Sequence, residues 1–351
     1  MRKQFSKAVK IWLIAGCVLL FFQVVIGGIT RITGSGLSIT KWEIVTGTLP
    51  PMNEAQWDEA FDLYKDTPQY KKINEGMSMS DFKFIYFWEY FHRLWARIMG
   101  FVFLFPFLYF LWTKAFDKKL LRYLITVFLL AVLAASMGWI MVASGLLDRP
   151  WVNAYKLALH LSVALSCFGV LMWTTYYAFQ PEANLSSNYT QYKKYWRAFL
   201  GLLIVQIFIG GVMSGMKAGI YYPSWPDMNG EFIPSLLWKS QFWTVESFNY
   251  YDQYPLVPAL IQSIHRIIAY VLFFSGLYLF FKQQKVSEFS HELRSNWLFI
   301  SLLTSQVIFG ILTVINCVAE VPLFYGVMHQ AFAMLLLMIT LYINYLMSAD
   351  K

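Results

Sequence analysis

The sequence predicts an all-α integral membrane protein, with eight transmembrane helices arranged as two tandem four-helix bundles. Composition is the first reason: 58% of the 351 residues are hydrophobic and only 14% are charged, against about 25% charged in a typical soluble protein. The second reason is that apolar runs near the length of about twenty residues that spans a bilayer recur along the chain. The third is that the two halves of the chain resemble each other.

The eight spans are separated by connections of very unequal length. We expect them at roughly residues 10–30, 90–112, 122–144, 155–178, 196–216, 259–281, 296–317 and 323–347. The first run follows the basic segment MRKQFSKAVK, as a signal peptide would, but it is long and no clear small-residue cleavage site follows it. We therefore expect a retained helix.

The distribution of Lys and Arg predicts the orientation of these spans. Basic residues gather before the first span and in the connections after every second span, at Arg2, Lys3, Lys7, Lys10, Lys114, Lys118, Lys119, Arg122, Lys193, Lys194, Arg197, Lys282, Lys285 and Arg294. By the positive-inside rule, both termini face the cytoplasm and the long loops 31–88 and 217–258 face outward. No Arg-rich transit segment precedes the first span, which favours a bacterial plasma (inner) membrane. With this one-sided pattern, the net charge of +8 predicts no nucleic-acid partner.

The two halves share several motifs in register. QVVIGG at 23–28 recurs as QIFIGG at 206–211, HRLWARIMG from His92 recurs as HRIIAYVLF from His265, and His160 then matches His329. A duplicated unit with an even number of spans keeps its orientation, so the copies should be related by a pseudo-two-fold axis along the membrane normal. We therefore expect two four-helix halves, residues 1–180 and 181–351. The small glycine pairs would let neighbouring helices pack closely.

Four of the five histidines lie near the start of an even-numbered span, one in each: His92, His160, His265 and His329. All four should therefore lie at a similar depth near the outer face. A lone intramembrane histidine can simply bond to a neighbouring helix, but ionisable residues within the membrane mark functional sites by default. Two histidines facing each other in each half predict two bis-imidazole haem sites. The fifth, His291, lies in a polar segment and reads as a solvated loop residue.

Directly bound zinc or copper is the rival interpretation of these histidines. Such ions are usually held by three or four ligands at one point. The second half has two histidines with no acid within a turn of either. The three cysteines, Cys17, Cys167 and Cys317, form no CxxC pair, so neither a structural disulfide nor a zinc site is expected. Haem fits the pattern better.

The halves differ at the position three residues before the first histidine, which is Glu89 in one and Gln262 in the other. A carboxylate can transfer protons and an amide cannot, which predicts that the first half carries the chemistry. The alternative is that Glu89 only complements the dipole at a helix start. Arg93 and Arg266 each follow a histidine and are candidate contacts for haem propionates, with lipid phosphate as the alternative.

Five stretches together resemble the haem A synthase family: GGITRITGSGLSITKWEIVTGTLPPMNEAQWDEAFDLYKDTPQYKKIN in the first loop, EYFHRLWAR after it, then GWIMVASGL, IQSIHRIIAY and MHQAFAMLLL. The resemblance covers essentially the whole chain. It matches the subtype that has a long first outer loop without the paired loop cysteines of other members. It implies oxidation of the C8 methyl of haem O to a formyl group, which gives haem A for cytochrome oxidase.

Residue by residue, the resemblance implies that His92 and His160 frame the substrate haem and that Glu89 is the catalytic carboxylate. It implies that His265 and His329 ligate the iron of a resident haem b. Haem O would enter from membrane lipid, and an electron donor of unknown identity would be required. Haem O synthase, cytochrome oxidase assembly factors and further copies of this chain are candidate partners.

The sequence departs from the family pattern in two places. Ala134 and Ala135 stand where Gln-Gly often precedes the GW motif, and the first loop has Thr33, Gly34 and Ser35 where Thr-Glu-Ser is usual. Both departures concern packing near the site more than its chemistry. The outer-loop aromatics Trp42, Tyr221, Tyr222 and Trp225 are typical of an interfacial belt, and no catalytic role is assigned to them.

Two other classes of membrane protein compete with the synthase. A two-haem electron-transfer cytochrome b without oxygenation would explain the four histidines but not Glu89 or the first loop. A haem transporter would suit parallel repeats, but it needs a substrate path to both faces, and the inner parts of these helices lack intramembrane charges. The sequence therefore favours the synthase.

Overall fold

The computed structural model describes residues 4–41, 49–146, 149–179 and 187–348, and within these residues it contains helices and no β-strand. Eight of the described helices are long and apolar enough to cross a membrane. They are α1 (Lys7–Ile32), α3 (Met79–Trp112), α4 (Lys118–Gly145), α5 (Ala154–Phe179), α7 (Lys193–Gly215), α9 (Leu256–Gln284), α10 (Ser290–Ile315) and α11 (Leu323–Ser348). The prediction of an all-α, multi-pass membrane protein with eight spans is confirmed.

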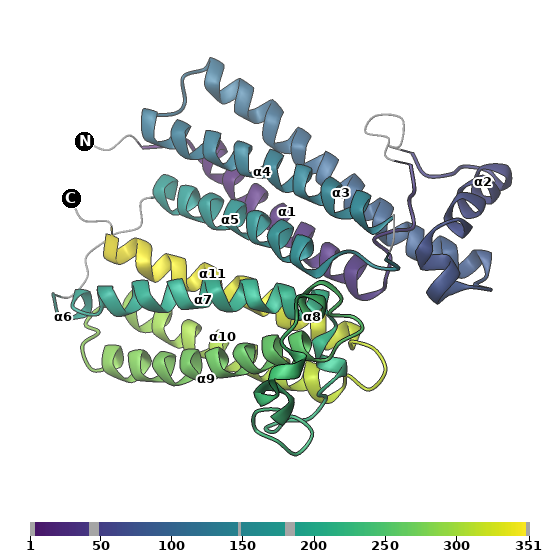
Figure 1. The fold of residues 1–351 in the computed structure, drawn as a ribbon. Helices are drawn as coiled ribbons and strands as arrows, with labels where there is room; N and C mark the ends of the chain where they lie inside the picture. Colours follow the sequence, from purple (N-terminus) through teal and green to yellow (C-terminus); the bar gives the residue numbers. More distant parts are fainter. Residues whose placement is uncertain (1–3, 42–48, 147–148, 180–186, 349–351) are drawn as a thin grey trace.

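The shorter elements lie in the connections. They are α2 (Glu54–Lys65), a π-helix (Tyr70–Asn74), α6 (Ser187–Thr190), three short 3₁₀ turns (Ala218–Ile220, Ser235–Trp238 and Ser240–Phe242) and α8 (Val245–Asn249). Both termini lie at one end of the molecule, and α2 and α8 lie at the other (Figure 1). We call these the termini end and the loop end.

The second span begins earlier than its predicted start at residue 90. α3 starts at Met79, where Ser78 and Asp81 form a reciprocal capping box. The added turns are amphipathic, because Phe82 and Ile85 are buried in an aromatic cluster that includes Phe61 of α2. A hydropathy window reads these turns as loop, since Asp81 and its polar neighbours dilute the apolar signal.

The helices of each half pack in a corresponding order. α1 contacts α3 and α5, and α4 contacts α5; likewise α7 contacts α9 and α11, and α10 contacts α11. The halves meet through α5 with α7, α1 with α11, and α5 with α11. The pseudo-two-fold relation and the boundary between the halves stay predictions. One difference is plain: α9 packs along α10, whereas α3 and α4 are not among the extensively packed pairs.

A proline inside α3 shows how the spans satisfy their backbone within the bilayer. Pro106 has no N–H to donate, which frees the carbonyl of Val102 one turn earlier. The indole of Trp12 on α1 donates to that carbonyl at 2.9 Å. A neighbouring helix thus supplies the missing donor, as membrane helices require.

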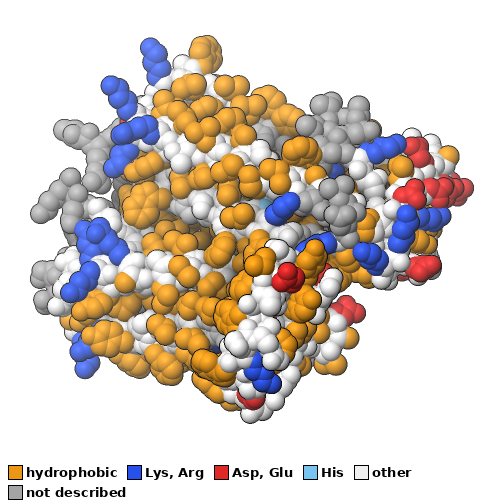
Figure 2. Space-filling model, viewed as in Figure 1, with side chains coloured by type: hydrophobic (Ala, Val, Ile, Leu, Met, Phe, Trp, Pro, Cys, Tyr) orange, Lys and Arg blue, Asp and Glu red, His pale blue; other side chains and the backbone are white. Residues whose placement is uncertain are grey.

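The surface matches a bilayer environment. Hydrophobic side chains cover the sides of the helices, and Lys and Arg side chains lie at both ends, without acidic neighbours at the termini end (Figure 2). Large apolar residues such as Phe105 and Phe274 are exposed on the sides of the helices. The acidic residues visible in this view lie at the loop end.

Candidate functional site

The four histidines of the spans share one kind of setting. Each ring lies against a glycine on an adjacent helix, and a Cβ added to that glycine would meet the ring's Cε1 at 2.8 to 3.2 Å. The pairs are His92 with Gly27, His160 with Gly138, His265 with Gly210, and His329 with Gly310. These glycines lie five to seven residues before the last residue of their helices, so the rings share one level near the loop end.

The residue one turn before each glycine also reaches the histidine. Nδ1 of His160 donates to the Ala134 carbonyl at 2.9 Å, and Nδ1 of His329 donates to the Gln306 carbonyl at 3.0 Å. A carbonyl can only accept, so Nδ1 carries the proton and Nε2 keeps its lone pair in both rings. That tautomer leaves Nε2 as the metal-binding nitrogen.

The other two histidines are held through side-chain amides. Gln23 places its Nε2 3.2 Å from Nε2 of His92, and Gln206 donates to the backbone carbonyl of His265 at 2.9 Å. Nδ1 of His265 is buried and has no hydrogen-bond partner among the described residues. A buried ring nitrogen without a partner is costly unless a ligand satisfies it.

The pair in the second half has a geometry that suits bis-imidazole ligation. The ring centroids of His265 and His329 are 6.4 Å apart, with planes at 72°. A metal ion held between two imidazoles by bonds of about 2 Å would give a separation close to this value. In the part of the chain that the structure describes, no group of three or more His, Cys, Asp or Glu could hold a metal ion.

All four histidines line one cavity of about 2440 Å³. This is well above the roughly 300–1,000 Å³ of a pocket for a drug-sized ligand. Most of the lining is apolar, and Glu89 and Glu320 are its acidic side chains among the described residues. Such a cavity can hold large, flat, apolar ligands beside both histidine pairs.

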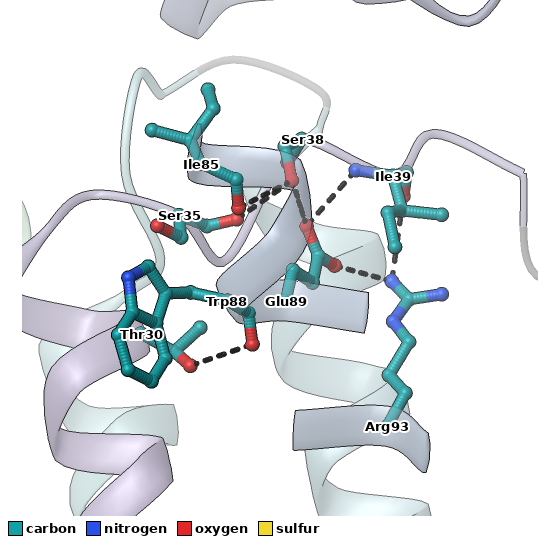
Figure 3. A network of polar contacts seen from close by, with 8 residues as sticks. All are labelled: Thr30, Ser35, Ser38, Ile39, Ile85, Trp88, Glu89 and Arg93. Carbon is teal, nitrogen blue, oxygen red and sulfur yellow. Dashed lines mark hydrogen bonds and ion pairs between the residues drawn. The ribbon is translucent and has the colours of Figure 1, made fainter. Parts of the chain in front are cut away.

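Glu89 anchors the loop that follows α1 to α3 (Figure 3). Its Oε2 accepts from the backbone N–H and hydroxyl of Ser38, both at 2.7 Å, and from the N–H of Ile39 at 2.9 Å. Its Oε1 accepts from Arg93 at 2.5 Å. The side chain is buried and lies three turns into the helix, so it is not a helix-start carboxylate as the alternative interpretation required.

Gln262 occupies the corresponding position in the second half, but it donates a hydrogen bond where Glu89 accepts them. Its Nε2 donates to the Tyr222 carbonyl at 2.9 Å. Arg266 donates to the carbonyls of Asp227 at 2.6 Å and Ser224 at 2.8 Å. The first loop therefore presents N–H groups to a carboxylate, while the second presents carbonyls to an amide and a guanidinium.

Both arginines that were candidate propionate contacts are thus engaged by the protein. Arg93 bonds to Glu89, and Arg266 bonds to the loop between α7 and α9. Arg31 and Lys217 also line the cavity between the two halves, and Arg31 donates to the carbonyls of Ser214 and Gly215. Burial, and next the charge of Arg31, lowers the pKa of the Lys217 ammonium. Apart from their charge, no sequence pattern marks these two residues.

The remaining sequence-predicted residues fall outside the histidine pairs. Cys17, Cys167 and Cys317 are free and buried. Trp225 lines the cavity, whereas Trp42 lies outside the described residues. The hydroxyl of Ser224 donates to the Asp227 carboxylate and so lowers its pKa, which favours a negative charge near Arg266.

Comparison with known proteins gives one consistent family. The model of the COX15-CtaA family, described as cytochrome oxidase assembly protein, matches residues 10–341. A protein of Nitrosospira multiformis named Heme A synthase is 38% identical over 97% of this chain and 93% of its own length. Those of Flavobacterium johnsoniae (38%, 95% and 96%) and Bradyrhizobium diazoefficiens (39%, 94% and 89%) carry the same name. The chain belongs to the COX15-CtaA family of cytochrome oxidase assembly proteins.

Proposed function

We propose that this chain is a haem A synthase, a membrane oxidoreductase that converts the C8 methyl of haem O to the formyl group of haem A. The observation that carries the proposal is one apolar cavity lined by two histidine pairs at one depth. The names of its relatives support the activity. The product would serve cytochrome oxidase assembly.

The second half holds the resident haem b in this proposal, with His265 and His329 as axial ligands. The 6.4 Å centroid separation supports this assignment. So does the contact between α9 and α10, where a Cβ on Gly276 would meet Leu303 at 2.3 Å. α9 and α10 are in close contact at Gly276. When bound, haem b supplies one-electron redox chemistry.

The first half binds the substrate in this proposal, between His92 and His160. The seam between α3 and α4 supports exchange with lipid, because these helices are not extensively packed. Phe103 stacks on Phe128 at a centroid distance of 6.4 Å toward the termini end. Nearer the histidines, a Cβ on Gly100 would meet no described atom within 4 Å. An apolar porphyrin with a prenyl tail could pass there from the bilayer.

Glu89 is the proposed catalytic carboxylate. Each of the two oxidations replaces one C–H bond of the methyl carbon by C–OH with O2 as the oxidant, while two electrons from the donor and two protons reduce the other oxygen atom to water. The resulting hydrated aldehyde then loses water. Protons must be delivered and removed at a site closed to bulk water, which suits a buried carboxylate on the same helix as His92. Ser38 and Arg93 fix its orientation. Arg31 and Lys217 add positive charge that would favour propionates.

The proposed location is a bacterial plasma membrane, with the termini end in the cytoplasm. The Lys and Arg side chains at that end support this orientation (Figure 2). The histidine level then lies near the outer face. Reporter fusions at Lys118 and Lys285 should report the cytoplasm, and a fusion at Asn229 should report the outer side.

Expression in a host that makes haem O but not haem A tests the activity. Extracted pigments, separated by chromatography, should contain haem A only when this chain is present. A preparation rich in bound haem b that leaves haem O unchanged would instead identify a two-haem electron-transfer cytochrome b. The electron donor would then be sought by reduction of the resident haem.

A further inference from the structure

The two glycines of each repeated pair face different halves of the molecule. Gly27 and Gly210 lie against the histidine of their own half. A Cβ on Gly28 would meet Oε1 of Gln330 at 2.4 Å, and one on Gly211 would meet Leu161 at 3.3 Å. Gln330 and Leu161 directly follow the second histidine of the opposite half. Each pair therefore places its helix between its own histidine and the other half.

Only one of these two cross-half contacts is polar. Nε2 of Gln330 on α11 donates to the Val24 carbonyl of α1 at 2.6 Å. Leu161 occupies the corresponding place on α5 and cannot make such a bond. At this pair of matching positions, the polar connection therefore runs from α11 to α1, and Leu161 makes no equivalent bond to α7.

The bonded stretch of α1 is also the stretch that supports His92. Val24 lies between Gln23, whose amide is 3.2 Å from Nε2 of His92, and Gly27, whose face meets the His92 ring. A shift of α11 at Gln330 would strain a 2.6 Å bond to α1. That shift would then move the groups that hold the His92 ring in place.

We infer that Gln330 is a positioning residue for the substrate site: it couples the resident-haem pair of one half to His92 of the other. The inference rests on the proposed function, because it takes His92 as a substrate-haem ligand. Occupancy of the His265 and His329 site then sets the position of His92 before substrate binds. Loss of the Gln330 amide should loosen His92 without removing any haem ligand.

The test is a titration of the purified full chain, carrying its resident haem b in detergent, with haem O. Wild-type protein should develop a second low-spin signal. Gln330→Leu, which copies Leu161, should weaken that binding roughly tenfold, the size of one good interhelical hydrogen bond. The added haem should also show a shifted absorption and reduction potential, while the resident haem keeps its own.

Asn344→Leu is the matched control. Asn344 is also a buried amide on α11 and donates to a carbonyl of another helix, Trp196 on α7, at 3.2 Å. It lies near the termini end, away from the histidines. Its loss should lower thermal stability and leave both haem signals unchanged.

A second variant reaches the same contact from α1. Gly28→Ala should push the flexible Gln330 side chain aside and reproduce the Gln330→Leu spectrum, while Gly211→Ala should not. Wild-type affinity and spectrum in Gln330→Leu would overturn the inference, as would equal shifts of both haems. Wild-type protein that takes up no added haem would overturn the proposed function itself, and the inference with it.

Discussion

The two halves of this molecule have corresponding helices and histidines, but their loop ends are closed with opposite polarity. In the first half, Glu89 accepts from loop N–H groups, and in the second, Gln262 donates to a loop carbonyl. The exchange of Glu for Gln therefore follows from which backbone groups each loop presents. The Glu–Gln difference alone does not locate the chemistry, because it has this structural reason.

The contact between α9 and α10, compared with that between α3 and α4, distinguishes the two halves more clearly. α9 packs along α10 around Gly276, whereas α3 and α4 lack a comparable seam and leave open space beside Gly100. A closed seam suits a ligand that stays, and an open seam suits one that exchanges with lipid. The comparison supports the proposal that the second half keeps its ligand and the first half exchanges it.

The largest expected effect is loss of the resident haem. His265→Ala or His329→Ala should strip most low-spin haem b from the purified protein, because each removes an axial ligand. His92→Ala and His160→Ala should keep it. Pyridine haemochrome assays and absorption spectra give the occupancy, and full occupancy in either second-half variant would break the assignment.

Glu89→Gln comes next. Loss of a general acid/base typically costs roughly a hundredfold or more in rate, so haem A yield should collapse while haem b stays bound. The amide would also face loop donors, which should make the first loop more sensitive to protease. Partly oxidised hydroxymethyl haem could accumulate if the second step depends more on the carboxylate, and chromatography would detect it.

Ser38→Ala separates the two roles of Glu89. It removes one loop donor and leaves the carboxylate and the N–H contacts of the loop in place. We expect a looser loop with most of the haem A yield retained. If Ser38→Ala abolished haem A as fully as Glu89→Gln does, loop anchoring would account for the whole effect and the proton-transfer role would be unsupported.

Much of the fold was predictable because hydrophobic runs of bilayer length dominate the sequence. The eight spans and the helix assignment of all four histidines follow from that signal. The start of α3 at Met79 was missed, because its first turns bury Phe82 and Ile85 against a loop helix while their other faces are polar. A window average cannot resolve one-sided burial.

Less of the candidate site was predictable. The repeated glycine pairs indicated close helix packing. That the first glycine of each pair lies against a histidine and the second against the other half depends on tertiary structure. The donors around Glu89 are backbone groups of a distant loop. Their direction depends on how the loop folds, which no local pattern in the sequence specifies.

A moderate effect is expected from filling the open seam. Gly100→Trp places a ring where a Cβ has free space, so folding and haem b content should stay normal while haem O uptake slows several-fold. In the closed seam, Gly276→Ala should instead cost about 1–3 kcal/mol in stability through overpacking against Leu303. Haem O uptake kinetics measure the effect of Gly100→Trp, and thermal unfolding measures that of Gly276→Ala. Unchanged uptake in Gly100→Trp would argue for another entry route.

The smallest effect should come from Gln262→Glu, which makes the second half imitate the first. A carboxylate there would face the Tyr222 carbonyl with no donor between them, which should cost about 1–3 kcal/mol. We expect a lower melting temperature and no new activity. A stabilised variant would contradict the polarity argument.

The central claim is that one histidine pair keeps its haem while the other exchanges it. Pigment analysis of His92→Ala and His329→Ala, purified from a host that makes haem O, tests this most directly. We predict that His92→Ala retains haem b and lacks haem O and haem A, while His329→Ala loses most haem b. If both variants lost the same pigments in the same proportion, the two halves would be equivalent and the account would be wrong.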